Sequence, residues 1–597
     1  MDKTDTIVKL ISDNEKGLKL LKDYLELNDE ESELIKEYPT VYIHNWIKDG
    51  KYEVYVGETN NFFSRTNQHI NEGCKKNVWQ KNILNKDASL YVIAHPKFNK
   101  SLTLDVENKL IHYLSSSNNI SKVHNARGNP QNKYYLCEEF NTIFTNIWNS
   151  LIKYNKTLFL SENEIQDSAI YKASPLHKLN EEQTIAKEKI IDKISECLIK
   201  DKKNQLVFVE GISGTGKTVL MSSIFYDIKN KTEHVYTQKG ENLLRDLECA
   251  LVVNHSEQLI VYEEIVKKLD IAKKGENLVY NPTTLINLFK NKKNSPQKRD
   301  KLFDVILIDE AHLLLTQNNQ SFTDDNQLEE LLKYAKVVIM MFDKKQILTA
   351  EQYKDEKFIN KYKSLSQEND SYIELTTQMR ILANEEEFEW IKSIINDGKI
   401  EKLTKNRSDY EIKSFDTPLD LEKAIKIKAR DNKSKLSRLV ATYDWPYSSV
   451  SSPLDEKYWN VKIGDWKKPW NREIIRYSQK SDIKNIKGLS WAEQPQTIDE
   501  IGSTYTIQGF DLNYVGVIIG PSIKYRDGKL IYEPLDSCNK KATNKRTLED
   551  GNKVSFGQEF IKNELGVLLT RGVNGLYIYA CDEALREQLK KSIGGKI

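Results

Sequence analysis

Gln205-Leu-Val-Phe-Val-Glu-Gly-Ile-Ser-Gly-Thr-Gly-Lys-Thr218 is the stretch that decides the fold of this 597-residue chain. Its short apolar run predicts a buried strand, and the pattern after Thr218 predicts a helix. A glycine-rich turn between the two lets backbone N–H groups surround phosphate oxygens at the helix N-terminus. We therefore predict a phosphate-binding loop, with contacts from Gly211, Ser213, Gly214, Thr215, Gly216, Lys217 and Thr218.

Two side chains of this loop have predicted roles in nucleotide chemistry. Lys217 should reach the β- and γ-phosphates of a bound nucleotide, and the Thr218 hydroxyl should bind Mg²⁺. ATP and Mg²⁺ are therefore the expected cofactors of this half of the chain.

A second motif is acidic: the carboxylates Asp309 and Glu310 end the stretch Phe303-Asp-Val-Ile-Leu-Ile-Asp309-Glu310. A buried strand would deliver both carboxylates at its C-terminal end, where ligands bind in α/β sheets. Asp309 could hold Mg²⁺, largely through water. Glu310 could orient and deprotonate the attacking water.

Short apolar runs alternate with helical patterns from residue 205 onward, as in parallel α/β layers. The runs are 206–210, 250–255, 305–309, 337–343, 514–520 and 575–580. Residues 444–500 are rich in Trp, Lys and Pro, and we interpret them as an irregular insertion.

The first part of the chain differs in its residue pattern and net charge. Residues 1–38 are polar, with apolar residues spaced for one face of a helix, and residues 1–39 carry a net charge of −5. Residues 40–155 carry a net charge of +5, which permits a nucleic-acid partner. Two alternating segments around Asp49-Gly50 predict a β-hairpin.

Composition excludes several classes of protein. Hydrophobic residues make up 39% and charged residues 29% of the chain, which rules out collagen-like and wholly disordered proteins. We find no run of 18 apolar residues and no secretory signal, so we expect a cytoplasmic protein without a membrane partner. The six cysteines include no CxxC pair, so we expect reduced thiols and no zinc site.

The ordered motifs of the second half resemble superfamily 1 helicases, and most closely the Schlafen-type helicase-like ATPases. The resemblance rests on Leu179-Asn-Glu-Glu-Gln183, Asp343-Lys-Lys-Gln346, Met379-Arg380, Ser503-Thr-Tyr-Thr-Ile-Gln508-Gly509-Phe-Asp511 and Leu569-Thr-Arg571-Gly572. It implies two RecA-like lobes, at roughly 179–365 and 366–597.

The same resemblance implies roles for individual residues. Gln183 would read adenine, and Gln346, Gln508 and Gly509 would belong to the nucleotide site. Arg380 and Arg571 would come from the second lobe and stabilise charge on the γ-phosphate. Hydrolysis would then be coupled to lobe closure.

Residues 38–150 resemble a GIY-YIG nuclease, in the order Tyr42, Tyr55, Arg65, Glu107 and Asn125. Thr40 replaces the first glycine of the name motif, and His69 lies one helical turn after Arg65. The resemblance implies metal-dependent endonuclease activity.

Phosphodiester hydrolysis needs an activated water, a cation over the phosphate and a metal near the leaving oxygen. Tyr42 could act as the general base, and Arg65 could clamp the phosphate. Glu107 could hold Mg²⁺ or Mn²⁺, while Tyr55 and His69 could pass protons or position water.

The expected organisation is multidomain α/β: a small α+β nuclease domain followed by two parallel-sheet lobes. The expected boundaries are 1–38 for a helical acidic lead-in, 39–154 for the nuclease domain, 155–178 for a connector, and the two lobes as above. We predict an ATP-dependent nuclease-helicase or translocase that acts on DNA in antiphage defence. A DNA-repair enzyme and a non-cutting, ATP-gated nucleic-acid sensor are the alternatives, and the sequence leaves the oligomeric state open.

Overall fold

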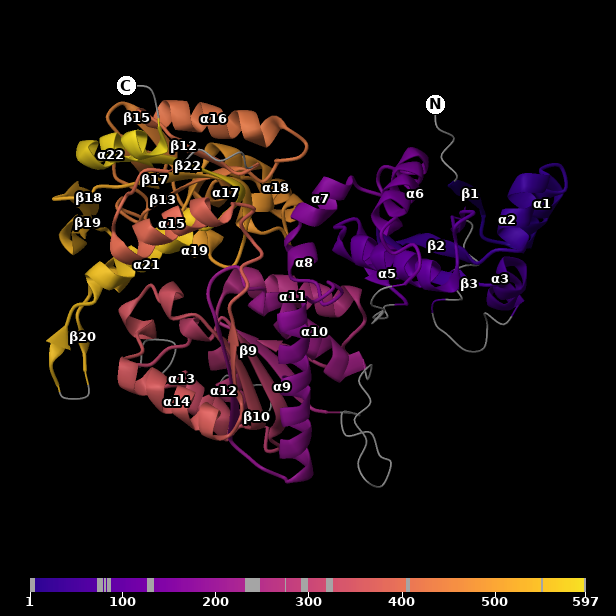
Figure 1. Cartoon of the computed structure of the whole chain (residues 1–597), viewed down its shortest axis with the longest axis horizontal. Helices are drawn as coiled ribbons and strands as arrows, with labels where there is room; N and C mark the ends of the chain where they lie inside the picture. Colours follow the sequence, from indigo (N-terminus) through magenta and orange to yellow (C-terminus); the bar gives the residue numbers. More distant parts are fainter. Residues whose placement is uncertain are drawn as a thin grey trace. The chain divides into compact units, whose positions relative to one another are not determined.

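The computed structural model describes residues 6–71, 79, 82, 87–125, 134–230, 247–273, 275–290, 299–317, 326–403, 409–548 and 551–594. The chain forms two compact units (Figure 1). Unit 1 comprises Met1–Lys178 and Tyr262–Asn277, and unit 2 comprises Leu179–Val261 and Leu278–Ile597. Cys74 lies outside the described residues.

Unit 1 is built on a five-stranded sheet of order β1-β4-β2-β3-β5, antiparallel except where β3 pairs with β5. The strands are β1 (Ile7–Ser12), β2 (Thr40–Lys48), β3 (Lys51–Thr59), β4 (Ser89–Ala94) and β5 (Ile120–Val123). The helices are α1 (Glu15–Leu25), α2 (Asp29–Lys36), α3 (Phe62–Asn71), α5 (Lys100–Ser116), α6 (Phe140–Tyr154), α7 (Glu162–Asp167) and α8 (Ala169–Lys172).

The β-hairpin predicted around Asp49-Gly50 is confirmed. β2 and β3 pair through Lys48 and Lys51, and the two turn residues have φ of 50° and 77°. Two successive positive φ values match the turn that best follows strand twist. The hairpin therefore places Tyr42 opposite Gly57 and His44 opposite Tyr55.

The helical prediction for the start of the chain is wrong at residues 7–12. These residues form the edge strand β1, which pairs with β4 from Ile7 to Ser12. The apolar positions 7, 10 and 11 fit a helix face, but the sheet offers a backbone partner that local spacing does not reveal. Helix begins only at Glu15, where the Asn14 side chain caps α1.

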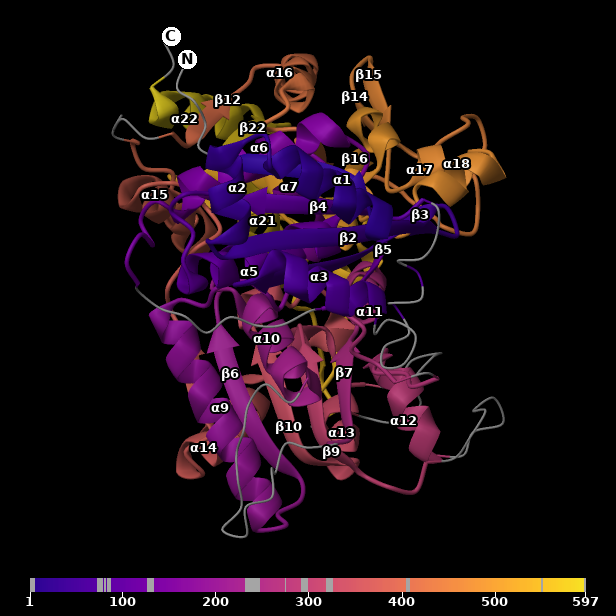
Figure 2. The same cartoon turned by 90° about the vertical axis from the view of Figure 1, so that its right-hand side faces the viewer.

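Unit 2 contains a parallel six-stranded sheet of order β11-β6-β10-β9-β7-β8. Figures 1 and 2 show α9 and α10 beside this sheet, and in Figure 1 α13 and α14 lie on its other side. The strands are β6 (Gln205–Gly211), β7 (Cys249–Val253), β8 (Val279–Tyr280), β9 (Phe303–Asp309), β10 (Ala335–Phe342) and β11 (Tyr372–Leu375). The helices are α9 (Glu181–Ile199), α10 (Lys217–Asn230), α11 (Ser256–Lys268), α12 (Pro282–Lys290), α13 (Gln327–Lys333) and α14 (Glu356–Glu368). Of α11, the residues from Tyr262 onward belong to unit 1.

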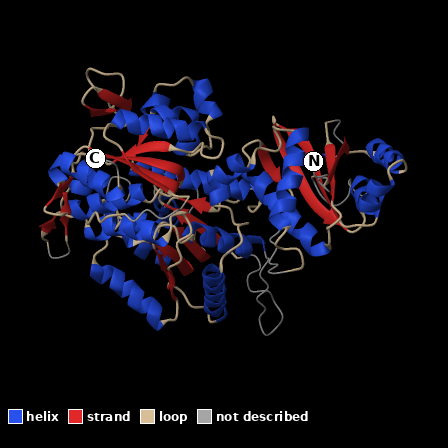
Figure 3. Ribbon diagram, turned by 45° about the horizontal axis from the view of Figure 1, so that its top comes forward, coloured by secondary structure: helices blue, strands red, loops and turns tan. Residues whose placement is uncertain are grey.

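A second parallel sheet, of order β12-β22-β17-β13-β16, forms the other lobe of unit 2. Figure 3 shows the strands of each sheet in red among blue helices. The strands are β12 (Glu411–Ser414), β13 (Arg438–Ala441), β16 (Ile501–Gly502), β17 (Leu512–Ile519) and β22 (Gly572–Ala580). The main helices are α15 (Glu385–Asp397), α16 (Pro418–Arg430), α19 (Thr504–Ile507), α21 (Gly557–Leu569) and α22 (Glu583–Ile593).

Short elements fill the segment 444–500 and the region before α21. Residues 444–500 contain the hairpin of β14 (Asn460–Ile463) and β15 (Trp466–Pro469), followed by α17 (Glu473–Arg476) and α18 (Lys480–Asn485). We call residues 444–500 the insertion. The later elements are β18 (Ile523–Arg526), β19 (Lys529–Tyr532), α20 (Lys540–Thr543), β20 (Arg546–Thr547) and β21 (Lys553–Val554).

The predicted fold class is confirmed: a small α+β domain is followed by two parallel-sheet lobes. The boundary between the lobes, expected between residues 365 and 366, lies later in the chain. β11 pairs with β6 and therefore belongs to the first sheet. Residues 376–384 join the lobes. Within the described residues, every helix is too short or too polar to cross a lipid bilayer.

Three neighbouring strands position the phosphate-binding region. β10 lies between β6 and β9 in the parallel sheet. Their carboxyl ends therefore bring Gly211, Asp309 and Asp343 to one edge. That edge is where α/β sheets bind ligands.

Candidate functional site

The loop between β6 and α10 has a backbone that requires glycine. Gly214 and Gly216 have φ of 91° and 75°, in the left-handed region. A Cβ atom at Gly216 would lie 2.2 Å from Nε2 of Gln183, so that side chain packs directly on the loop. Gln183 Nε2 lies 3.3 Å from the carbonyl oxygens of Thr215 and Gly216, to which it donates. Gln183, which the resemblance predicts to read adenine, is therefore in contact with the loop.

Lys217 lies at the centre of this region and is 7% exposed. Its Nζ donates to the carbonyl oxygens of Gly211 at 2.6 Å and Ile212 at 2.9 Å. The Asp343 carboxylate lies 3.8 Å away. The ammonium group is thus held at the loop by groups that a phosphate could replace.

Asp309 gathers hydrogen bonds from two different elements. The Thr218 hydroxyl donates to Oδ2 at 3.0 Å, and Nε2 of Gln258 donates to the same oxygen at 2.7 Å. The backbone N–H of Glu310 donates to Oδ1 at 3.0 Å. A hydroxyl beside a carboxylate offers the hard oxygen donors that Mg²⁺ prefers, so these residues fit the predicted metal.

Glu310 is held in an unusual backbone conformation, with φ of 51° and ψ of 47°. Its Oε2 is buried without a hydrogen-bond partner in the described structure and lies 3.4 Å from Nε2 of His312. Burial, and then the charge of Asp309, raise the pKa of the Glu310 carboxyl above its usual range. A buried carboxyl with raised proton affinity is suited to accept a proton from water.

Two guanidinium groups contact the tip of the loop. Nη1 of Arg380 donates to the Ser213 hydroxyl, and Nη2 of Arg571 donates to the same hydroxyl at 3.3 Å. Arg571, between α21 and β22, comes from the second lobe as predicted. Arg380 instead lies in the joining segment after β11, so its predicted origin in the second lobe is corrected.

Each arginine is held by further contacts. Arg380 Nε forms an ion pair with Asp511 at 2.5 Å. Arg571 donates through Nε to the Val567 carbonyl at 2.9 Å and is 1% exposed. Burial, and then the charge of Arg380, lower the pKa of Arg571 to about 9.

The remaining predicted residues link the two lobes. Nε2 of Gln508 donates to the Gln346 carbonyl at 3.1 Å. Gln346 itself donates to Asp343 at 2.8 Å. Gly509 has φ of 85°, and a Cβ there would lie 3.9 Å from Oε1 of Glu310. The structure therefore brings all predicted residues of the nucleotide site into one region of unit 2.

Sequence reasoning missed Gln258 as a member of this site. It lies in the first turn of α11, which begins three residues after β7 ends at Val253. β7 is a parallel neighbour of β9, so its carboxyl end reaches the same edge as Asp309. A polar residue at the start of that helix was the available signal.

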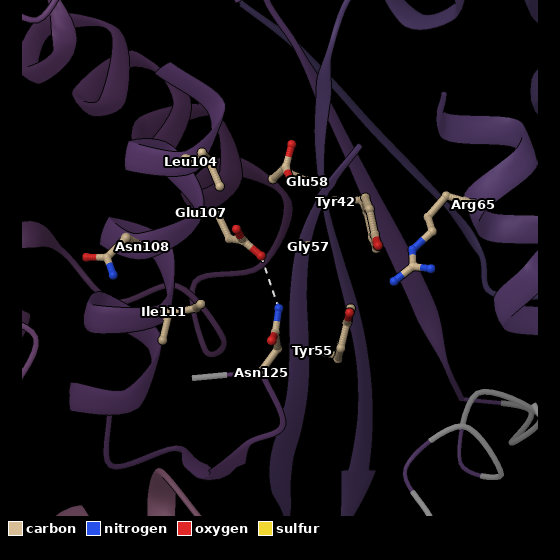
Figure 4. Close-up of a pocket in the computed structure, with 10 residues that line it drawn as sticks. All are labelled: Tyr42, Tyr55, Gly57, Glu58, Arg65, Leu104, Glu107, Asn108, Ile111 and Asn125. Carbon is tan, nitrogen blue, oxygen red and sulfur yellow. Dashed lines mark hydrogen bonds between the residues drawn. The ribbon is translucent and has the colours of Figure 1, made fainter. Parts of the chain in front are cut away.

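A second polar site lies in unit 1, in a cavity of about 180 Å³. Figure 4 shows Arg65 of α3 pointing toward the two tyrosines of β2 and β3, with Glu107 of α5 across the cavity. The lining residues are Tyr42, Tyr55, Gly57, Glu58, Arg65, Leu104, Glu107, Asn108, Ile111 and Asn125.

Tyr42 is almost fully buried at the centre of this site. Its hydroxyl lies 3.1 Å from Nε2 of His69. Burial, and then Tyr55, raise the pKa of Tyr42 well above its usual range, although Arg65 opposes the shift. Burial lowers the pKa of His69 to about 3, so at neutral pH its ring is uncharged and can accept a hydrogen bond from the tyrosine hydroxyl.

Two further predicted residues, Glu107 and Asn125, line the cavity and are hydrogen-bonded to each other. Nδ2 of Asn125 donates to Oε1 of Glu107 at 3.0 Å and to the Val56 carbonyl at 2.8 Å. A Cβ at Gly57 would lie 2.5 Å from the Tyr42 hydroxyl, so glycine leaves room for the phenol. The six residues predicted for this region thus lie around one cavity or, for His69, against its central tyrosine.

Some neighbours of this site were not predicted. Glu58 lines the cavity, and its carboxylate pairs with Lys100. His44 Nδ1 lies 2.6 Å from Asp13, and both side chains are fully buried. Trp79 stacks on Tyr55 with ring centroids 4.0 Å apart. These contacts join residues up to 42 positions apart, which local motif spacing does not reveal.

Comparison with known proteins identifies the family to which residues 204–582 are similar. The family model "Schlafen group 3, DNA/RNA helicase domain" matches residues 204–582. The uncharacterized protein YPL245W of Saccharomyces cerevisiae is 34% identical over 437 residues, covering 69% of this chain and 90% of that protein. The crystal structure of Pif1 helicase from Candida albicans aligns with 14% identity and a TM-score of 0.27, covering 69% of this chain and 97% of that one. The family match spans the phosphate-binding loop and Arg571, and it does not include the residues around the Tyr42 cavity. Because the match covers more than half of the chain, this chain belongs to the Schlafen group 3 helicase-domain family.

Proposed function

We propose that this protein is an ATP-dependent helicase or translocase that acts on DNA and cuts it with a nuclease site in unit 1. The observation that carries the motor proposal is the meeting of Arg380 and Arg571 on Ser213, beside Asp309 and Glu310. Phosphoryl transfer needs cations where charge develops on the γ-phosphate, and water activation on the opposite side.

The residues of the nucleotide site divide the chemistry among them. Lys217 and the loop backbone would bind the phosphates, while Thr218 and Asp309 would hold Mg²⁺. A bound Mg²⁺ supplies positive charge that stabilises the transferred phosphoryl group. Glu310 orients the attacking water and accepts its proton, because it is buried and has a raised pKa.

The arginines couple this chemistry to movement of the second lobe. Arg571 is positioned by α21 and β22, so it reaches the loop only when the lobes are closed. Opening would withdraw a positive charge from the γ-phosphate. Repeated closure and opening during hydrolysis is the motion that moves a motor along a strand.

The nuclease proposal rests on the geometry of the cavity in unit 1. Arg65 clamps the phosphate, and Tyr42 in its phenolate form takes a proton from the attacking water. Against the effect of burial, Arg65 lowers the pKa of this phenol, and a bound metal would lower it further. Glu107 would hold a hard cation, and a bound Mg²⁺ or Mn²⁺ would supply charge near the leaving oxygen. Asn125 holds the Glu107 carboxylate in place.

Antiphage defence is the cellular role that we propose, because a nuclease domain joined to an ATP-driven translocase suits the restriction of invading DNA. A role in DNA repair and a non-cutting sensor are the alternatives. Metal-dependent cleavage by the purified protein separates the first two from the sensor. Phage plating on expressing and non-expressing cells separates defence from repair.

The first prediction concerns ATP hydrolysis. Lys217→Ala should abolish turnover and weaken nucleotide binding, because it removes a phosphate contact. Glu310→Gln should abolish turnover but keep binding, because it removes only the proton acceptor. Steady-state ATPase assays and binding of a fluorescent ATP analogue check both. Turnover near the wild-type rate in Glu310→Gln contradicts the assignment.

The second prediction concerns the nucleic acid. Single-stranded DNA should stimulate ATP hydrolysis, and the stimulation should fade as salt rises from about 50 to 200 mM, because binding is mostly to phosphates. Lys217→Ala protein should bind the same DNA without hydrolysis. ATPase activity that is equal with and without DNA and RNA would favour the sensor.

The third prediction concerns cleavage. Tyr42→Phe removes one hydroxyl, Glu107→Ala removes the metal carboxylate, and Arg65→Ala removes the phosphate clamp, so each should reduce plasmid cleavage at least about tenfold. Basal ATPase activity should be unchanged in all three, because these residues lie outside the nucleotide site.

Melting temperature serves as the control for folding in these variants. An exposed tyrosine, Tyr135, offers a matched substitution, since Tyr135→Phe deletes a hydroxyl at a side chain that is 84% exposed. If Tyr42→Phe and Glu107→Ala both cut like the wild type, unit 1 is not the nuclease.

A further inference from the structure

Gln258 occupies a buried position at the nucleotide site that none of the motifs assigns. It lies in the first turn of α11 and is 4% exposed. Its Nε2 donates to Oδ2 of Asp309 at 2.7 Å, the oxygen that also accepts the Thr218 hydroxyl. Because a carboxylate only accepts hydrogen bonds, this contact fixes which end of the Gln258 amide faces Asp309.

The other end of the same amide lacks a partner. Oε1 of Gln258 is buried and has no hydrogen-bond partner in the part of the chain that the structure describes. A Cβ atom at Gly509 would lie 3.6 Å from this oxygen and 3.9 Å from Oε1 of Glu310. Both oxygens therefore border the space beside Gly509, which only glycine leaves open. A buried acceptor without a partner is costly, so a donor is expected there in the functional state.

The residue before Gln258 is bound by the insertion. The Glu257 carboxylate forms an ion pair with Nη2 of Arg472 and accepts the backbone N–H of Trp491 at 3.2 Å. Glu257 is 7% exposed, so this ion pair is shielded from solvent on one side. Arg472 and Trp491 both belong to the insertion of the second lobe.

Adjacent residues of one helical turn thus contact two different parts of unit 2. Glu257 is held by the insertion, and Gln258 is held on Asp309. A helical turn is rigid, so a shift at Glu257 moves Gln258 as well.

We infer that Gln258 is a positioning residue of the ATPase, which acts through Asp309, and that Glu257 ties its position to the insertion. The inference rests on the proposed ATPase function. Gln258 holds the Asp309 carboxylate, which would bind Mg²⁺, and its Oε1 would accept a hydrogen bond from a water molecule at the site. Partners of metal ligands that play this role contribute strongly to metal affinity or to activity.

The test compares Gln258→Leu and Gln258→Glu with the wild type. Leucine removes both polar groups at similar volume, and glutamate keeps the shape but places a second negative charge at Asp309. Each protein also carries Glu107→Ala, so that the N-terminal carboxylate does not contribute to metal binding. Glu263→Gln is the matched control, an exposed residue of the same helix.

The main readout is the dissociation constant of Mn²⁺ from the protein–ADP complex, measured by electron paramagnetic resonance. We expect it to rise about 10- to 100-fold in Gln258→Leu, with ADP affinity and melting temperature nearly unchanged. Gln258→Glu should lower kcat for ATP by about tenfold or more, because the added charge displaces Asp309. Glu263→Gln should match the wild type in every assay.

The link to the insertion is tested with Arg472→Gln. This variant should weaken Mn²⁺ binding, and combining it with Gln258→Leu should add little, because both changes act through one helical turn. Mn²⁺ affinity and kcat within twofold of the wild type in both Gln258 variants would overturn the positioning role. Fully additive effects of Arg472→Gln and Gln258→Leu would overturn the link. If the wild type itself does not hydrolyse ATP, the proposed function fails instead.

Discussion

The Ser213 hydroxyl at the tip of the phosphate-binding loop accepts hydrogen bonds from two guanidinium groups that reach it from different segments. Arg380 comes from the segment that joins the lobes, and Arg571 comes from the short segment between α21 and β22. The same joining segment bonds to the loop backbone, where the Met379 N–H donates to the Gly214 carbonyl at 2.9 Å. The loop thus depends on both lobes for its surroundings.

Burial explains why this arrangement suits phosphate chemistry. Asp309, Glu310 and Arg571 are each less than one-tenth exposed, so charges in the site interact with little screening by water. Burial raises the pKa of Glu310 and lowers that of Arg571, because the protein interior solvates each charged form less well than water does. A bound triphosphate with its metal would place negative charge beside Arg571 and positive charge beside the carboxylates.

Much of the nucleotide site could be predicted from the sequence, because its residues follow buried strands at fixed spacing. Gly211 and Asp309 end two of three neighbouring parallel strands, and Asp343 directly follows the third. The hydrophobic runs before these residues predict the strands. The prediction failed where long-range pairing decides structure. Residues 7–12 form a strand because β4 pairs with them, and β11 joins the first sheet because β6 does.

The contacts of single side chains were the hardest to predict. The pairs Gln258–Asp309 and His44–Asp13 join residues 51 and 31 positions apart in sequence. Neither pair has a local pattern, since each depends on how strands are ordered in a sheet. In contrast, Tyr42, Tyr55 and Arg65 were predicted together from the resemblance to a GIY-YIG nuclease. A tight hairpin and the following helix hold them at short separation in sequence.

The central claim is that the two arginines complete the nucleotide site from outside the first lobe. Single-turnover hydrolysis of ATP by Arg380→Ala and Arg571→Ala tests it most directly, with melting temperature and ATP affinity measured on the same samples. The account predicts that Arg571→Ala lowers the rate by about 10³-fold or more while ATP affinity changes only a few-fold, and that Arg380→Ala lowers it in the same direction. Hydrolysis by both folded variants within about twofold of the wild-type rate would contradict the account.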